Sequence, residues 1–111
     1  MASLKLKVIR AHLDRDTATF LNMDPFVFVS WEGGEGKTAT CHDGGNRPDW
    51  SELDNEIDCG DGNIIGMINV KIKDENMTSD KFVAQCNIVS HSLKQGKGIK
   101  NWYKILYDNE T

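Results

Sequence analysis

The sequence has few cysteines, no long apolar run and no excess of basic residues, and each shortage excludes a class of protein. Three cysteines at irregular spacing, Cys41, Cys59 and Cys86, favour reduced thiols over a disulfide framework or a zinc site. No segment approaches the roughly 18 apolar residues that a membrane-spanning helix needs. The net charge of −4 argues against a nucleic-acid-binding protein, because phosphate binding requires a concentrated basic surface.

The two ends of the sequence carry no recognisable targeting signal. The first residues lack the basic-then-apolar layout of a secretory signal, and neither end has a lipidation motif. We therefore expect a cytoplasmic protein whose contact with membranes is peripheral and reversible. The 111 residues, of which 39% are hydrophobic and 27% charged, fit a single folded domain over residues 1–111.

No set of residues indicates an enzyme. The three histidines, His12, His42 and His91, are far apart, and no nucleophile signature lies near them. The segment 33–38, GGEGKT, ends like a phosphate-binding loop, but Trp31 stands where the first glycine is required. Strand patterns on both sides of this segment predict a hairpin, so we expect no catalytic activity.

Hydrophobic alternation with a period of two predicts strands and no convincing helix. The expected strands are 4–11, 26–31, 37–41, 64–73, 82–89 and 102–107. Gly-rich turns join them, and about seven short strands at this spacing predict an all-β antiparallel sandwich. The strand 26–31 is apolar on both faces, as expected at the centre of a sheet.

Four acidic residues at alternate positions are predicted to share one face of a further strand. They are Glu52, Asp54, Glu56 and Asp58. An ordinary solvated outer face is one interpretation, and an acidic stripe that docks a partner is the other.

Five segments, taken in order, together resemble the C2 domain family: 6–11 (LKVIRA), 23–29 (MDPFVFV), 37–38 (KT), 46–52 (NRPDWSE) and 102–106 (WYKIL). They span nearly the whole chain. The resemblance implies an antiparallel Greek-key β-sandwich of seven to eight strands. It also implies a binding module for acidic phospholipid membranes or for a protein partner, commonly with calcium ions in the loops at one end.

The resemblance implies a calcium site whose candidate ligands come from two loops: Asp16 and Asp24 in the first, and Asp74, Asn76 and Asp80 in the second. Two positions depart from the family pattern. Ala18 replaces an aspartate, so Asp14 or Asp16 could serve only if the loop takes a different course. Lys81 replaces another aspartate, and an ammonium group there opposes cation binding. Calcium-dependent and calcium-independent binding both stay open.

Four apolar loop residues are predicted to contact the membrane: Phe20, Leu21, Met23 and Met77. The alternative for Phe20 and Leu21 is that they pack inside the end of the sandwich. Outward lysines on strands are predicted to add a basic patch for phosphoinositides, unless they serve only solubility: Lys5, Lys7, Lys71 and Lys73.

The protein-binding alternative uses an open sheet edge. Family members usually continue past the segment that 102–106 resembles into one more strand, whereas this sequence ends at Thr111. Either the chain is a shortened form, or the N-terminal residues rearrange, or an edge is open for a partner strand. The last reading predicts a protein partner or a homodimer formed by strand addition.

Overall fold

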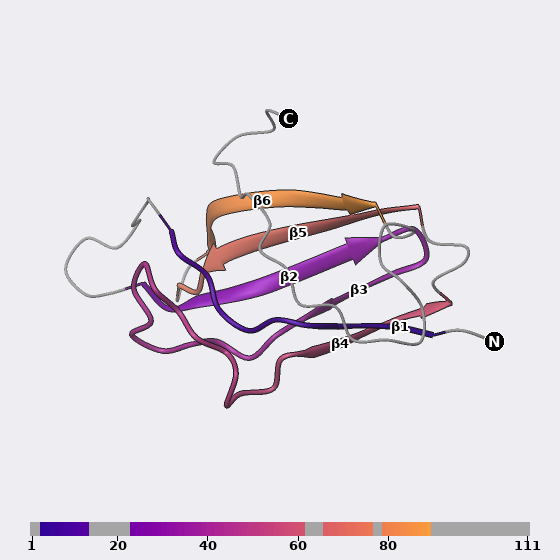
Figure 1. Cartoon of the computed structure of the whole chain (residues 1–111). Coiled ribbons are helices and arrows are strands. Elements are labelled where there is room, and N and C mark those ends of the chain that lie inside the picture. The colour runs from indigo at the N-terminus through magenta and orange to yellow at the C-terminus, as the bar shows by residue number, and fades with distance from the viewer. Residues whose placement is uncertain (1–2, 14–22, 62–65, 77–78, 90–111) are drawn as a thin grey trace.

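The computed structural model describes residues 3–13, 23–61, 66–76 and 79–89, and the regular elements in these ranges are all strands (Figure 1). The strands are β1 (Ser3–Lys7), β2 (Pro25–Trp31), β3 (Gly34–Lys37), β4 (Glu56–Asp61), β5 (Met67–Asp74) and β6 (Lys81–Val89). The predicted all-β antiparallel fold is confirmed. The strand expected at 102–107 lies outside the described residues.

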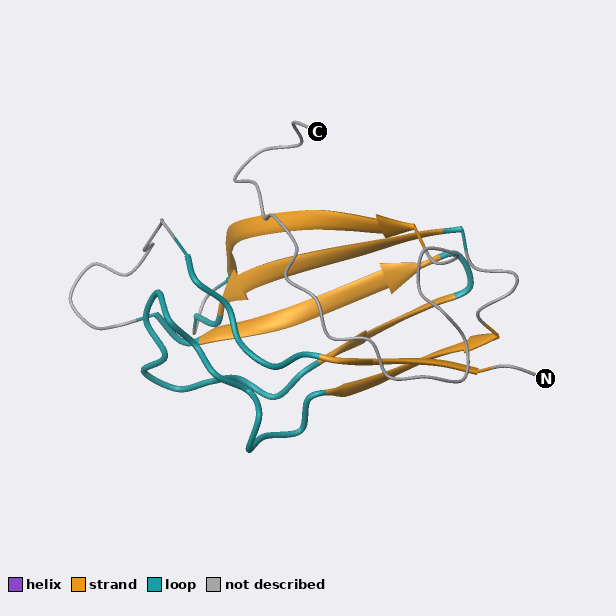
Figure 2. Ribbon diagram, in the orientation of Figure 1, coloured by secondary structure: helices purple, strands orange, loops and turns teal. Residues whose placement is uncertain are grey.

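The strands form two antiparallel sheets. The larger sheet has the order β3-β2-β5-β6, and β1 pairs with β4 in the smaller one. Figure 2 shows the two sheets one above the other, with long loops gathered at one end of the sandwich. The sheets approach closely at Gly36 of β3, where a Cβ atom would lie 3.0 Å from Cγ2 of Ile57 on β4. A larger residue at this position would push the two layers apart.

The core lies between the sheets and follows from alternation along the central strands. Val27 and Val29 of β2 and Ile68 and Ile72 of β5 point inward and are buried. Trp50 from the loop before β4 is fully buried, and its indole N–H donates to the carbonyl oxygen of Pro25 at 3.3 Å. Each such side chain contributes about 1.5–3 kcal/mol on burial, so this apolar layer is the main stabilising term.

Three of the expected strands have a boundary that is wrong by more than one residue. The strand expected from residue 64 begins at Met67, because the described Gly66 is not part of it. β1 ends at Lys7 rather than at residue 11, because Ala11 pairs its backbone N–H with the Pro48 carbonyl of a loop. β3 covers Gly34–Lys37 instead of 37–41. A tight turn at Glu32 and Gly33, where Gly33 has φ 109°, brings the glycine-rich segment straight back against β2. The glycine-rich composition of this segment predicts a loop, but the segment pairs with the edge of β2 and forms a strand.

Only two of the four acidic residues predicted to share a strand face lie on a strand. Glu52 and Asp54 lie in a turn and bend before β4, and only Glu56 and Asp58 lie on the strand. These two pair across the sheet with Lys7 and Lys5 respectively. Directly opposed residues on an antiparallel pair share a face, so each of these acidic residues lies on the same face of the smaller sheet as a lysine.

Candidate functional site

The outer face of the larger sheet carries aromatic and basic side chains. Because Val27, Val29 and Ile72 point into the core, the residues that alternate with them point away from it. The outward set consists of Phe26 and Phe28 of β2, Lys37 of β3, and Lys71 and Lys73 of β5. The sequence predicted that the strand 26–31 is apolar on both faces, and Phe26 on the outer face is only 6% exposed. The sequence did not indicate that Lys37 is a neighbour of the β5 lysines.

Two of these lysines lie over the phenylalanine rings. The Lys73 ammonium nitrogen is 4.9 Å from the centre of the Phe28 ring, and that of Lys37 is 5.6 Å from the centre of the Phe26 ring. Both distances fall within the range of about 6 Å in which a ring face attracts a cation. In the register, Lys73 faces Phe26 and Lys37 faces Phe28, so each lysine reaches diagonally to the other ring. The rings thus hold both ammonium groups against the sheet.

An open pocket of about 350 Å³ lies beside these rings. We call it the sheet-face pocket; its lining residues are Phe26, Phe28, Glu35, Gly36, Lys37, Lys73 and Asp80. It therefore presents two ammonium groups and two carboxylates around aromatic walls. Gly36 also lines the pocket, and a Cβ atom built on it would meet Ile57 at 3.0 Å.

The four lysines expected to form one basic patch are divided between the two sheets. Lys71 and Lys73 lie on the outer face of the larger sheet. Lys5 and Lys7 lie on β1 of the smaller sheet, opposite Asp58 and Glu56. A single four-lysine patch is therefore wrong, and the acids facing β1 offset the charge of its two lysines. Lys37 takes their place beside the β5 pair.

Two predicted calcium ligands meet at the end of the larger sheet. The Asp74 carboxylate accepts a hydrogen bond from the Asp24 backbone N–H at 2.9 Å, and Asp24 in turn accepts one from the Asp43 N–H at 2.8 Å. Asp74 is only 5% exposed. In the second loop, the Asp80 carboxylate accepts a hydrogen bond from the Asn76 N–H at 3.3 Å. Asp16 lies outside the described residues.

This arrangement does not by itself fit a calcium ion. The described ranges contain no group of three His, Cys, Asp or Glu side chains placed to hold a metal. Lys81 is the cross-strand partner of Asp74, so the departure seen in the sequence brings a cation to this end of the sheet. His42 adds a ring nitrogen 3.9 Å from the Asp24 carboxylate. A calcium ion needs six to eight oxygen ligands, more than the described carboxylates bring together.

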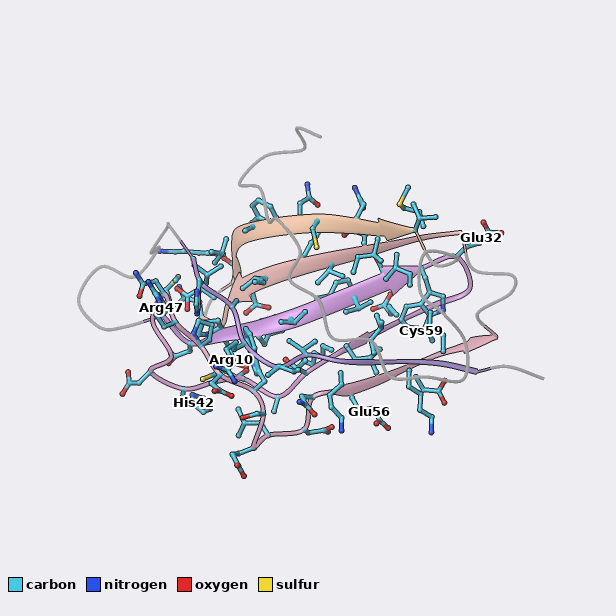
Figure 3. All side chains as sticks on the ribbon, viewed as in Figure 1. Arg10, Glu32, His42, Arg47, Glu56 and Cys59 are labelled. Atoms are coloured by element: carbon cyan, nitrogen blue, oxygen red, sulfur yellow. The ribbon has the colours of Figure 1, made fainter. Side chains whose placement is uncertain are left out.

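Further basic side chains accompany the same loops. In Figure 3, Arg10, His42 and Arg47 lie at the loop end of the sandwich, whereas Glu32 lies at the opposite end. Arg10 forms an isolated antiparallel β-bridge with Asp49. Hydrogen bonds from the side chain and the backbone of Ser51 are the main causes that lower the pKa of the Asp49 carboxyl, and the charge of Arg10 adds a smaller lowering.

Of the residues predicted to contact a membrane, Met23 is described and does not reach the surface. Its side chain has 0% exposure and packs in the core cluster, so this prediction is wrong. The Met23 carbonyl accepts from the Gly45 N–H at 3.0 Å, which fixes the chain there with the side chain turned inward. Phe20, Leu21 and Met77 lie outside the described residues.

The three cysteines are free thiols in the structure. Burial raises the pKa of Cys59 to about 11, and the neighbouring charge of Asp58 adds to the shift. Burial also raises the pKa of Cys86. Neither thiol has the lowered pKa of a nucleophile.

In the described part of the chain, no helix is long and apolar enough to cross a membrane.

The fold resembles that of several solved structures. The C2A domain of RIM from Drosophila is 13% identical, with a TM-score of 0.72 over 95% of this chain and 86% of that one. A C2 domain-containing protein from a putative elicitor-responsive gene is 20% identical, with a TM-score of 0.61 over 80% of this chain. Human GIVD cytosolic phospholipase A2 is also 20% identical, with a TM-score of 0.69 over 86% of this chain.

The chain spans 64% of the elicitor-responsive structure and 13% of the phospholipase. A search of curated protein sequences gives no match. The family model described as "C2 domain" matches residues 2–105, which is nearly the whole sequence. The chain therefore belongs to the C2 domain family.

Proposed function

We propose that this domain is a non-enzymatic module that binds membrane surfaces containing acidic phospholipids, with the outer face of the larger sheet toward the membrane. The family is one of membrane, lipid or protein interaction modules. The observation that carries the proposal is the pair of lysine ammonium groups held over Phe26 and Phe28. Together with Lys71, they place three ammonium groups on one face of a chain whose net charge is −4, and Glu35 and Asp80 beside the pocket offset this charge only in part.

The position of the charge matters more than the total. Each lysine close to an anionic membrane surface contributes about 1 kcal/mol, and this contribution falls off within roughly 10 Å in ordinary salt. Lys37, Lys71 and Lys73 lie on a shared face, whereas Lys5 and Lys7 have acidic cross-strand partners. The larger sheet is therefore the better candidate for the membrane-facing side.

The test is co-sedimentation with vesicles of phosphatidylcholine alone or mixed with phosphatidylglycerol, in the presence of a calcium chelator. The double variant Lys37→Gln/Lys73→Gln removes two charges from the sheet face. The matched control Lys5→Gln/Lys7→Gln removes two charges from β1. At about 1 kcal/mol per lysine, the first variant is expected to weaken binding to acidic vesicles about thirtyfold, and the second to change it little.

Two results would contradict the proposal. Equal losses in both double variants would mean that only net charge matters, and no pelleting of the wild type with or without calcium would favour the protein-adaptor alternative. Repeating the co-sedimentation with calcium in place of the chelator tests whether binding depends on calcium. Pelleting that requires calcium and disappears in Asp24→Asn would move the membrane contact to the loop end.

A further inference from the structure

Glu35 lies on the outer face of the larger sheet and forms no ion pair there. It is an exposed residue of β3 and pairs in register with Ser30 of β2, so the two share a face. Among the described residues, the ion pair joins His42 and Asp24 and involves no lysine. The Lys73 ammonium group lies over the Phe28 ring instead. The outer face thus presents a carboxylate and an ammonium group that do not satisfy each other.

The register places Glu35 and Lys73 symmetrically about Phe28. Glu35 is opposite Ser30, on the β3 side of β2. Lys73 is opposite Phe26, on the β5 side of β2. Phe28 is the outward residue midway between Ser30 and Phe26 along β2. A two-fold axis that lies against the sheet at Phe28 therefore exchanges the position of Glu35 with that of Lys73.

We propose that a second copy of this chain packs on the outer face of the larger sheet, in a two-fold symmetric dimer centred on Phe28. In this dimer, Glu35 of each copy meets Lys73 of the other, and the two Phe28 rings approach at the axis. A two-fold dimer uses the same patch twice, so a patch with opposite charges at exchanged positions complements itself. The contact is between side chains and differs from strand addition at an open sheet edge.

The charges on this face favour a second copy over a partner of one sign. A wholly acidic partner would bring like charge against Glu35, and a wholly basic one would bring like charge against the lysines. The chain has a net charge of −4, so two copies repel each other on average. The three lysines Lys37, Lys71 and Lys73 make the outer face of the larger sheet a place where a copy meets opposite charge.

The contact is expected to be weak and reversible. β2 is seven residues long, and four strands side by side span roughly 20 Å, so the patch on each copy measures about 20 Å by 20 Å. Patches of this size are typical of complexes that dissociate readily, and exposed ion pairs add only modest stability. We therefore expect a dimer that is half-formed at about 100 µM chain. Because the same face is the proposed membrane contact, the dimer is the form away from the membrane.

Sedimentation equilibrium from about 10 µM to about 500 µM chain, without lipid, tests the proposal. Lys73→Glu opposes two carboxylates at each contact, and Glu35→Lys opposes two ammonium groups. Each variant alone is expected to weaken dimerisation about tenfold or more. An equal mixture of the two variants restores the opposite-charge pairs, and so does the double variant Lys73→Glu/Glu35→Lys. Both are expected to dimerise as the wild type does.

Glu32→Lys is the matched control, because Glu32 is exposed in the turn of the same hairpin and the net charge changes as in Glu35→Lys. It is expected to dimerise as the wild type does. A thermal unfolding curve checks that each variant is folded. The Glu35→Lys arm keeps the test valid if Lys73→Glu disturbs the fold through its lost contact with the Phe28 ring.

Three results would overturn the inference. The first is a wild type that stays monomeric throughout this concentration range. The second is a dimer that both single variants leave intact, because the contact would then lie elsewhere, such as a sheet edge. The third is a loss in the single variants that neither the mixture nor the double variant reverses. Since no lipid is present, each of these results leaves the proposed function untouched.

Discussion

The hydroxyl group of Thr38 holds the strand that carries the aromatic rings of the site, and its removal provides a quantitative test. Thr38 follows β3 and is 4% exposed. Its oxygen accepts a hydrogen bond from the Val27 N–H at 3.0 Å and donates one to the Ala39 carbonyl at 2.8 Å. Val27 stands between Phe26 and Phe28, so the bond fixes the backbone between the two rings.

Thr38→Val keeps the shape of the side chain and leaves the Val27 N–H without its acceptor. Val27 is buried, so water has poor access to replace the bond. A buried donor left without a partner costs about 1–3 kcal/mol. The Ala39 carbonyl is less buried and adds less. For a domain of this size, a loss of 1 kcal/mol lowers the melting temperature by about 4 °C or more.

Urea denaturation followed by tryptophan fluorescence measures the change, since Trp50 is fully buried in the folded state. Thr38→Ser retains the hydroxyl group and is expected to lose clearly less stability than Thr38→Val. Thr40→Val is the second control, because Thr40 is half-buried and its side chain makes no hydrogen bond within the described ranges. If Thr38→Val were as stable as the wild type, the hydroxyl bridge would not be a significant restraint on β2.

Three further predictions concern thiol reactivity, a carboxyl pKa and calcium. The thiolate is the reactive form of cysteine, and burial raises the pKa of Cys59 to about 11. A thiol reagent at pH 8 should therefore label Cys59 about a hundredfold more slowly than a free cysteine peptide. Labelling of the folded protein at the peptide rate would refute the burial of Cys59. Ser51→Ala should raise the pKa of Asp49, followed by NMR titration, because the Ser51 side-chain hydrogen bond is the largest cause of its lowering. Because the pKa of Asp49 is lower in the folded state than its ordinary value of 3.8, the ionised carboxylate stabilises the fold at pH values above 3.8. This stabilisation is lost as the pH falls through the folded-state pKa. An unchanged titration of Asp49 in the Ser51→Ala variant would contradict this assignment. Calcium titration calorimetry should give little heat if the described carboxylates do not form a site, whereas binding that is lost in Asp74→Asn would show that residues outside the described ranges complete one.

The fold could be predicted from the sequence where burial is strongly patterned. The apolar run 26–31 and the alternation around Ile68 and Ile72 predicted the two central strands, because apolar residues recur at the positions that face the core. β3 was misplaced since its sequence, Gly-Glu-Gly-Lys, has turn composition and becomes a strand only through pairing with β2. Pairing of this kind depends on tertiary context and leaves no local signal.

The candidate site was only partly predictable for a similar reason. Lys71 and Lys73 were identified from alternation, but composition cannot tell which face of an all-apolar strand is turned outward, so Phe26 and Phe28 were missed. The neutralising effect of Asp58 and Glu56 on the β1 lysines depends on register, which the sequence does not state. Lys81, by contrast, was visible in the sequence as a departure from the calcium-binding pattern, and in the structure it is the cross-strand partner of Asp74.

The most direct test of the central claim is to locate the membrane-contacting face by NMR. Amide signals of the ¹⁵N-labelled chain would be recorded with and without lipid nanodiscs that contain phosphatidylserine, in a calcium chelator. The account predicts that the largest changes fall on the outer face of the larger sheet, at Phe26, Phe28, Lys37 and Lys73. Changes confined to β1 and β4, or changes at the Asp24 and Asp74 end that require calcium, would contradict it.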